Sequence, residues 1–346
     1  MAELTAPRVL ALVAETLRPR FFDQATLDRL AQASGRRSSP GLRSSGLLWR
    51  GSLSAVGPDT DLSAVEVLIT DWGTPPLDAA VLDRFPALKL VAHTGASVKS
   101  LVTDELFRRG ILVTQAGDAM ARPVAEVSLT FTLALLHQLP RFDHAMHDRA
   151  DWTLASQAPP QHEIDGATIG VVGASRTGRA YLRLVQSLGA RTLVCDPTLD
   201  AADARELDAE LVSLDDLLRR SRIVALHAPS LPETHRMISA EQLALMTDGA
   251  GLVNTARSWL VDPAALLAEL QRGRIDAAID VFDDEPLPID SPLRLLPNVL
   301  LTPHRAAGTF EGQLRQGETV VDEIEAFLAG RSLRHTVGLN NLSRMA

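Results

Sequence analysis

The sequence predicts an α/β protein built from two doubly wound domains. Strand-like and helix-like segments alternate along the chain, which is the pattern of parallel βαβ units. The alternation covers residues 8–114, stops, and restarts at residue 168. With 346 residues, the chain is also longer than one compact core usually accommodates. Two α/β domains are therefore expected.

The first part of the chain predicts four strands with helices between them. The strands are expected at 8–13, 65–70, 88–93 and 111–114, and the helices at 24–33, 77–85 and 104–109. The segment 34–57 is rich in Ser, Gly and Arg, so a surface excursion is expected there. A long apolar helix is expected from Pro123 to Leu139, ending at Pro140.

The second part predicts six strands, at 168–172, 191–195, 223–227, 252–254, 275–280 and 299–302. Helices are expected between them, at 177–188, 213–219, 239–246 and 263–271. Six strands wound in this way are typical of dinucleotide-binding sheets. An amphipathic helix at 318–328 is expected to pack back onto the first domain. The predicted domains are residues 1–118 with 312–346, and residues 119–311, with ligand sites expected in the cleft between them.

Composition and charge argue against several classes of protein. The net charge is −9, from 34 basic and 43 acidic residues, so binding to nucleic acid or to an anionic membrane is not expected. The single cysteine, Cys195, allows neither an internal disulfide nor a thiolate zinc site. We therefore expect no metal, and we expect the protein to lie in the cytoplasm. We find no signal-peptide pattern, and the longest apolar stretch, 127–139, is too short to span a bilayer.

A glycine-containing turn follows the strand at 168–172 and opens a helix. In this turn Gly173 suits a tight bend, and Gly178 lets the helix meet the strand. Ser175 stands where a second glycine usually lets the backbone approach a pyrophosphate; its side chain narrows the space, although its hydroxyl can donate to a phosphate. Taken alone, the motif fits a dinucleotide site and a plain strand-to-helix turn equally well.

Asp196 favours the dinucleotide interpretation. It ends the next strand, 23 residues after Gly173, where a carboxylate can accept from the ribose hydroxyls. It can also form a turn before Pro197, and both roles are compatible. Because a carboxylate at this place repels a 2′-phosphate, NAD is favoured over NADP.

Six ordered motifs resemble those of the D-isomer-specific 2-hydroxyacid dehydrogenase family, and they cover about residues 88–312. The resemblance implies a Rossmann NAD-binding domain inserted into a flavodoxin-like substrate domain, in an NAD-dependent enzyme that moves a hydride between nicotinamide and C2 of a small 2-hydroxy or 2-oxo acid. It also implies a homodimer, with residues 123–152 reaching across the two-fold axis. The motifs are Val124-Ala125-Glu126, Asp165-Gly166-Ala167-Thr168-Ile169-Gly170, His227-Ala228-Pro229-Ser230-Leu231-Pro232-Glu233-Thr234, Asn254-Thr255-Ala256-Arg257, Asp280-Val281-Phe282-Asp283-Asp284-Glu285-Pro286 and Thr302-Pro303-His304.

Three residues of these motifs match the catalytic trio of the family, and each has a role that chemistry supports. The guanidinium of Arg257 can bind the substrate carboxylate bidentately and polarise the neighbouring oxygen. His304 suits the acid/base at the C2 oxygen, because imidazole titrates near neutral pH. Glu285, bonded to the far ring nitrogen, would orient the imidazole and favour its protonated form.

Further cofactor contacts are implied by the resemblance, residue by residue. Arg176 and Thr177 would lie at the pyrophosphate, Pro229 on the adenine side and Thr255 near the cofactor. Asp280 would face the nicotinamide amide, or else cap the end of its strand.

The substrate side departs from the family pattern. The loop after the strand at 88–93 reads Gly95-Ala96-Ser97-Val98-Lys99 where many relatives have Gly-x-Gly-x-Asp. Gly95, Ala96 and Ser97 are predicted to receive the substrate carboxylate, but Ser97 and Lys99 prevent the transfer of substrate identity. Trp72 could contact the substrate or pack between domains, and His93 is expected to be structural. Ser258 and Trp259 follow Arg257; the indole could narrow the pocket or cover the sheet.

Two other functions stay open at this stage. The same fold serves NAD(H)-sensing regulatory proteins of the corepressor type that retain the trio, because fold does not fix function. The family chemistry could also act on an unusual donor such as formate or phosphite.

Overall fold

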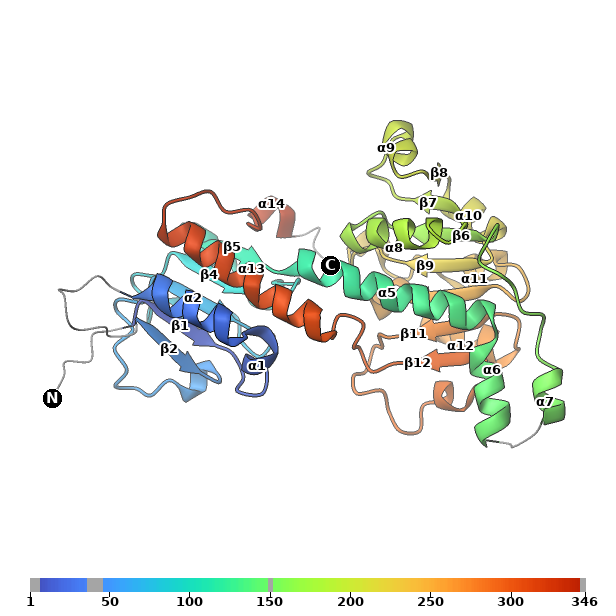
Figure 1. Ribbon diagram of the computed structural model, residues 1–346, viewed down its shortest axis with the longest axis horizontal. Helices are drawn as coiled ribbons and strands as arrows, with labels where there is room; N and C mark the ends of the chain where they lie inside the picture. Colours follow the sequence, from blue (N-terminus) through green and yellow to red (C-terminus); the bar gives the residue numbers. More distant parts are fainter. Residues whose placement is uncertain (1–6, 36–45, 149–151, 343–346) are drawn as a thin grey trace. The chain divides into compact units, whose positions relative to one another are not determined.

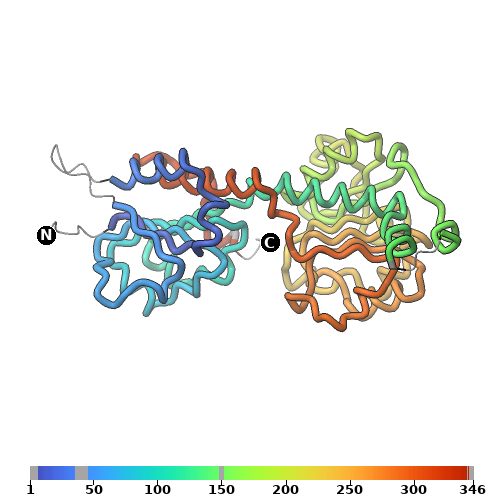
Figure 2. The backbone as a smooth tube through the Cα atoms, turned by 60° about the horizontal axis from the view of Figure 1, so that its bottom comes forward, coloured from blue at the N-terminus to red at the C-terminus, as the bar shows by residue number. Residues whose placement is uncertain are grey.

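The computed structural model describes residues 7–35, 46–148 and 152–342, and the chain forms two compact α/β units. Unit 1 consists of residues up to Met120 together with those from Thr309 onward, and unit 2 consists of Ala121–Gly308. The sequence-based boundaries lie within a few residues of these. The chain therefore enters unit 1, forms all of unit 2, and returns to unit 1 (Figures 1 and 2).

Unit 1 contains a five-stranded parallel sheet in the order β2-β1-β3-β4-β5. This is the flavodoxin-like order, whose switch point lies between β1 and β3. Every residue of β1, β3 and β4 is buried, as expected for parallel strands covered on both faces. The strands are β1 (Val9–Leu12), β2 (Leu47–Arg50), β3 (Val67–Thr70), β4 (Leu90–His93) and β5 (Leu112–Gln115).

Strand β2 corrects the prediction of a mere surface excursion at 34–57. Its four residues are only partly buried, and they pair with β1 at the edge of the sheet. A short edge strand among Ser and Gly residues leaves no periodicity to read, which explains the error. Residues 36–45, in the same segment, lie outside the described residues.

The helices of unit 1 bring its two chain segments together. Helix α13 packs against α1 and α2, and the red and blue helices lie side by side in both views (Figures 1 and 2). The sequence predicted α13 only from residue 318, so its first two turns were missed. The helices are α1 (Arg18–Phe21), α2 (Gln24–Ser34), α3 (Ala79–Leu82), α4 (Asp104–Arg108), α13 (Phe310–Leu328) and α14 (Leu339–Leu342), with a 3₁₀ turn at Leu53–Ala55.

Unit 2 contains a seven-stranded parallel sheet in the order β12-β11-β10-β9-β6-β7-β8. The six predicted strands are present, and the two-residue edge strand β8 was too short to predict. The order reverses at β6, between β7 and β9, as in doubly wound dinucleotide-binding folds, so the predicted fold class is confirmed. The strands are β6 (Thr168–Val172), β7 (Arg191–Cys195), β8 (Glu210–Leu211), β9 (Ile223–Leu226), β10 (Gly251–Asn254), β11 (Asp276–Ile279) and β12 (Val299–Leu301).

The four helices predicted between the strands of unit 2 are present as α8, α10, α11 and α12, and α6, α7 and α9 were not predicted. These helices are α6 (Leu139–Asp143), α7 (Trp152–Ser156), α8 (Arg176–Gln186), α9 (Ala201–Glu206), α10 (Leu214–Arg220), α11 (Ala240–Leu245) and α12 (Pro263–Gln271), with a π-helical turn at His144–Asp148 and 3₁₀ turns at Pro232–Thr234, Ser258–Leu260 and Pro292–Leu295.

Helix α5 (Gly117–Leu136) begins earlier than predicted, because Pro123 lies inside it rather than at its start. The Gln115 side chain accepts from the Gly117 N–H at 2.5 Å and caps the first turn. By length and composition, α5 could also cross a membrane, which the shorter stretch 127–139 had not suggested. Half of its most apolar window is buried, and Phe131 and Leu135 belong to the core of unit 2. Its packing is that of a core helix.

The contact between α13 and α1 requires a glycine. A Cβ on Gly317 would lie 1.7 Å from the backbone oxygen of Phe21. We therefore expect Gly317→Ala to lower the free energy of unfolding by about 1–3 kcal/mol, in spite of the better helix propensity of alanine. Thermal unfolding followed by circular dichroism tests this. Gly338→Ala, whose Cβ would meet nothing within 4 Å, is the control; equal stability of the two variants would contradict the packing argument.

Candidate active site

The predicted catalytic trio lies in unit 2, after three neighbouring strands. Arg257 follows β10, Glu285 follows β11 and His304 follows β12, and these strands are adjacent in the sheet. Because the strands are parallel, the loops after them leave the same edge of the sheet. Ligands of α/β proteins bind at this edge.

Glu285 and His304 form a hydrogen-bonded pair. The Nδ1 of His304 lies 2.7 Å from Oε2 of Glu285, and Oε1 of Glu285 accepts from the Phe282 N–H at 3.0 Å. Both side chains line a cavity of about 560 Å³ together with Thr302 and Arg294. With Nδ1 engaged, the Nε2 atom is the ring nitrogen that can exchange a proton with a ligand.

Two opposing effects act on the Glu285 carboxyl. Partial burial raises its pKa, but the hydrogen bonds from His304 and Phe282 and the charges of His304 and Arg257 outweigh it, so the pKa falls below its usual 4.5. Glu285 is therefore ionised at neutral pH and can accept from the imidazole.

Arg257 lies within electrostatic reach of the same carboxylate. Burial lowers the pKa of the guanidinium, and the charge of Glu285 acts in the opposite direction. The Nη1 atom donates to the carbonyl of Ala256 at 2.6 Å, and the Asn254 amide donates to the Arg257 carbonyl at 2.9 Å. The structure thus brings the three predicted residues together within one unit.

Asp280 holds the turn that carries His304. Its Oδ1 accepts from the Thr302 hydroxyl at 2.5 Å and from the Arg305 N–H at 2.9 Å, and its Oδ2 accepts from the Ala306 N–H at 2.9 Å. His304 itself has a left-handed backbone, with φ of 51°. The alternative role of Asp280 as a strand-end cap is therefore present in the structure.

The turn after β6 has the shape that a dinucleotide needs. Gly173 has φ of 94°, and a Cβ there would lie 2.6 Å from the Ala228 nitrogen. A Cβ on Gly178 would lie 2.1 Å from the Gly173 oxygen. Ser175 caps α8, because its Oγ accepts from the Gly178 N–H at 3.3 Å. The cap uses Ser175 as an acceptor, so its hydroxyl proton can still be donated to a phosphate.

Asp196 connects β7 to this turn. Its Oδ2 accepts from the Ala174 N–H at 2.7 Å, while its Oδ1 accepts from the Thr198 N–H at 2.8 Å and from the Thr198 hydroxyl at 2.6 Å. The turn-forming role is thus realised. Each carboxylate oxygen accepts more than one hydrogen bond in favourable cases, so contact with ribose hydroxyls is compatible with it.

The other predicted cofactor residues surround the same edge. Arg176 and Thr177 are the first two residues of α8, where helix N–H groups favour phosphate. The Thr255 hydroxyl lies 2.8 Å from that of Ser128 on α5, and the Pro229 carbonyl accepts from the Thr234 hydroxyl at 2.7 Å.

His227 lies buried behind the glycine turn, and this packing was not predicted from the sequence. Its ring packs on Tyr181 with centroids 5.0 Å apart, and burial lowers the pKa of His227 to about 3, so the ring is neutral. Among the described residues, its Nε2 has no hydrogen-bond partner. The only feature of the sequence that pointed to this packing is the position of His227 at the end of a predicted strand.

On unit 1, Trp72 lies against the predicted substrate loop. A Cβ on Gly95 would lie 2.6 Å from the Trp72 indole and 2.8 Å from Nε2 of His93. His93 is buried, its Nδ1 lies 3.0 Å from the Thr70 hydroxyl, and burial lowers its pKa to about 4. Trp72 is half exposed and packs edge-on against His93. His93 therefore packs as a structural residue, while Ala96 and Ser97 continue the turn beside it.

Trp259 packs onto a neighbouring loop of unit 2. Its indole N–H donates to the Leu231 carbonyl at 2.8 Å, and its ring packs against His235 in a tilted arrangement with centroids 4.1 Å apart. These contacts agree with the alternative in which the indole covers the end of the sheet. Ser258 lines a second cavity, of about 480 Å³.

Comparison with known proteins identifies the family to which this chain belongs. Residues 129–306 match the family model described as "D-isomer specific 2-hydroxyacid dehydrogenase, NAD binding domain". The chain belongs to the D-isomer-specific 2-hydroxyacid dehydrogenase family. Because the matched domain is the NAD-binding domain of this family, NAD is the cofactor of unit 2.

Two curated relatives illustrate the relationship within the family. The chain is 38% identical to the D-3-phosphoglycerate dehydrogenase of Mycobacterium tuberculosis (strain ATCC 25618 / H37Rv) over 82% of this chain and 54% of the relative. It is 34% identical to the glyoxylate reductase of Korarchaeum cryptofilum over 78% of this chain and 81% of the relative. The chain spans about half the length of the phosphoglycerate dehydrogenases that it matches.

Among solved structures, a D-lactate dehydrogenase of Aquifex aeolicus, in complex with NAD and lactic acid, superposes with a TM-score of 0.71. The two chains are 28% identical, and the match covers 93% of this chain and 95% of the other. The family fold is therefore present over nearly the whole chain.

The residues of unit 2 fit NAD. Gly173 and Gly178 pack so closely against backbone atoms that a Cβ at either position would clash, which keeps the turn tight, and α8 presents its N-terminus at the same turn. The buried, neutral His227 leaves an unpaired ring nitrogen behind this turn. Asp196 supplies the carboxylate next to it.

The lowered pKa of Glu285 predicts a pH-dependent contribution to stability. A carboxyl whose folded pKa is depressed stabilises the fold above its unfolded value, here 4.5, and loses this contribution as the pH falls through the folded value. Glu285→Gln should therefore lower the urea midpoint at about pH 7, and its difference from the native protein should vanish as the pH falls below the folded pKa of Glu285. Glu206→Gln, at an exposed position on α9, is the control. A difference that persists unchanged in acid would refute the assignment.

Proposed function

We propose that the protein is an NAD-dependent oxidoreductase that interconverts a small 2-hydroxy acid and the corresponding 2-oxo acid. The observation that supports this most is the Glu285–His304 pair within electrostatic reach of Arg257, in the unit that belongs to the family's NAD-binding domain. NAD(H), when bound, supplies the acceptor or donor of the hydride at C2.

His304 is the proposed acid/base. In oxidation its Nε2 takes the proton of the C2 hydroxyl, and in reduction it returns the proton to the C2 oxygen. Glu285 holds Nδ1 and stabilises the imidazolium that forms when Nε2 is protonated. Asp280 holds the turn, so the imidazole needs little rearrangement when the substrate binds.

Arg257 is the proposed anchor for the substrate carboxylate. Its planar guanidinium can donate two parallel hydrogen bonds to a carboxylate, and partial burial strengthens this interaction. In unit 1 we propose that the turn at Gly95, Ala96 and Ser97 binds a carboxylate of the acid through backbone N–H groups. Trp72 beside Gly95 would then contact the substituent at C2 of the acid.

We propose cofactor-binding roles for the remaining residues because they lie at the same edge of the unit 2 sheet as the trio. Ser175, Arg176 and Thr177 would bind the pyrophosphate, Asp196 the adenosine ribose, and Pro229 the adenine side. Thr255 and Asp280 would lie on the nicotinamide side. A carboxylate at 196 favours NAD over NADP. The matched relatives are dehydrogenases and reductases, which does not favour the NAD(H)-sensing alternative. The lone cysteine supports a proposed cytoplasmic location.

Turnover of 2-oxo acids tests the proposed roles. NADH oxidation should be measured with glyoxylate, hydroxypyruvate, pyruvate and phenylpyruvate. His304→Gln should lower kcat by about 10²–10⁴-fold while NADH binding, followed by its fluorescence, is kept. Arg257→Lys keeps the charge but loses the bidentate geometry, so it should raise KM for the acid. Full turnover by His304→Gln would overturn the proposed acid/base.

We also propose that the protein is a homodimer that associates through the segment after α5. Helices α6 and α7 lie at one end of unit 2 (Figure 1), and they and the turn between them expose Leu139, Met146, Trp152 and Leu154. Exposed apolar clusters of this kind mark association surfaces.

Size measurement tests the proposed dimer. The native protein should elute at twice the chain mass of 37.3 kDa, and the double variant Leu139→Asp, Met146→Asp should elute as a single chain. A native protein that elutes as one chain at micromolar concentration would exclude this dimer.

A further inference from the structure

Unit 2 has a second cavity beside the Glu285 loop, with a volume of about 480 Å³. Its walls come from the end of β11, from α12 and from the loop at 282–293. Val261, Leu266, Ile279 and Leu293 make most of its interior apolar. This volume lies within the range of small-molecule sites in proteins.

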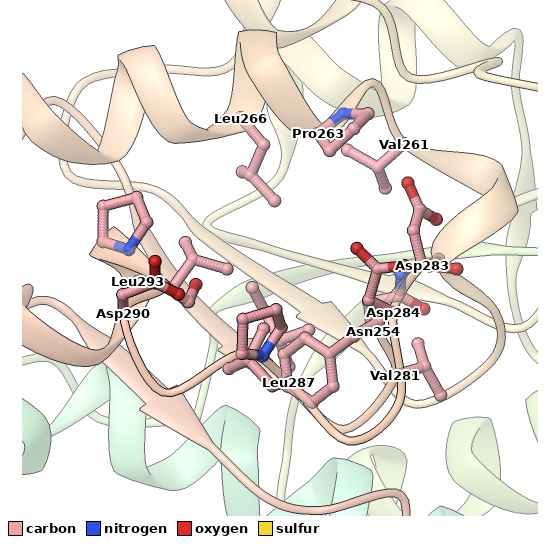
Figure 3. Close-up of a pocket in the computed structure, with 16 residues that line it drawn as sticks. Asn254, Val261, Pro263, Leu266, Val281, Asp283, Asp284, Leu287, Asp290 and Leu293 are labelled. Atoms are coloured by element: carbon pink, nitrogen blue, oxygen red, sulfur yellow. The ribbon is translucent and has the colours of Figure 1, made fainter.

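The rim of this cavity is acidic. Figure 3 shows Asp283 and Asp284 at one end of the cavity and Asp290 at the other, with Leu266 and Leu287 on opposite sides between them. Among the described residues, none of these three carboxylates has a hydrogen-bond or ion-pair partner. An apolar interior with three uncompensated negative charges at the rim complements an organic cation with an apolar body.

The same charges argue against an anion. The acids proposed as substrates carry a carboxylate, which the rim would repel. The cavity is therefore not an extension of the substrate site, and its ligand differs in charge from the substrate.

The cavity shares a wall with the one that contains His304. Phe282 and Leu287 line both cavities, and Glu285 lies between these two residues in the chain. Arg294 fixes the far end of this wall by donating to the carbonyls of Leu287 at 2.8 Å and Pro288 at 2.9 Å. A ligand in the acidic-rimmed cavity would contact the segment that positions Glu285.

We propose that the acidic-rimmed cavity binds a small alkyl- or arylammonium compound, and that this ligand modulates the enzyme through the 282–287 segment. Binding itself does not depend on the proposed substrate class. The consequence for turnover rests on the proposed function, so the two are tested separately.

Calorimetric titration of the full chain tests binding. The probe is hexylammonium, with hexanol and hexanoate as neutral and anionic compounds of the same chain length. Hexylammonium should bind at least about five-fold more tightly than hexanol, because a carboxylate near the ammonium adds on the order of 1 kcal/mol. Hexanoate should not bind in this cavity. Equal binding of hexylammonium and hexanol, or no saturable binding of hexylammonium at millimolar concentrations, would overturn the proposal.

Variants locate the site. Asp283→Asn with Asp290→Asn should remove the preference for hexylammonium, while Glu206→Gln, on α9 near the opposite edge of the sheet, should keep it. Leu266→Trp should fill the cavity and abolish binding of both hexylammonium and hexanol. If the charge variants bind hexylammonium as the native protein does, the site lies elsewhere and the proposal fails.

Kinetics separates this inference from the proposed function. With NADH and an active 2-oxo acid, hexylammonium should change kcat at saturating acid rather than compete with the acid. Competition with the acid would place the ligand in the substrate site and refute the modulation. If no acid is turned over, the calorimetric result still decides whether the cavity binds the cation.

Discussion

Parallel pairing of β11 with β12 places Glu285 and His304 in loops that leave the same sheet edge, and their 2.7 Å contact depends on that pairing. Asp280 adds the second constraint, because it directly follows β11 and accepts from Thr302, Arg305 and Ala306 around the histidine. A single buried carboxylate thus fixes a left-handed histidine backbone that would otherwise be strained. The proposed proton transfer needs an imidazole in one orientation, and these contacts supply it.

The strand order reverses at β6, so the same sheet edge carries the dinucleotide-binding turn on one side of β6 and the charged trio on the other. On one side of β6, the Gly173 turn, Ser175 and Asp196 form a polar surface with close backbone approach, which suits a dinucleotide. On the other side, β10, β11 and β12 carry the charged trio. Residues of the 282–287 segment line both the Glu285–His304 cavity and its acidic-rimmed neighbour.

Much of this arrangement could be predicted from the sequence, because parallel α/β units leave strong local signals. Apolar strands such as Thr168–Val172 and Arg191–Cys195 were predicted with the bounds that the structure has. Strands β2 and β8 were not predicted, because they are too short to show a periodic pattern. The start of α5 was misplaced, because it depends on a cap from Gln115 rather than on Pro123. The bonds of Asp280 and the burial of His227 arise from segments distant in the chain, so no local pattern reveals them. The acidic-rimmed cavity could not be predicted either, because its walls also come from segments distant in the chain.

The most direct test of the central claim is a crystal structure of the protein with NADH and oxamate, an unreactive analogue of a 2-oxo acid. The account predicts that Nε2 of His304 lies about 3 Å from the analogue's C2 oxygen, with Nδ1 still on Glu285 and the Arg257 guanidinium on the analogue's carboxylate. An analogue bound away from His304, or an imidazole that has left Glu285, would contradict it.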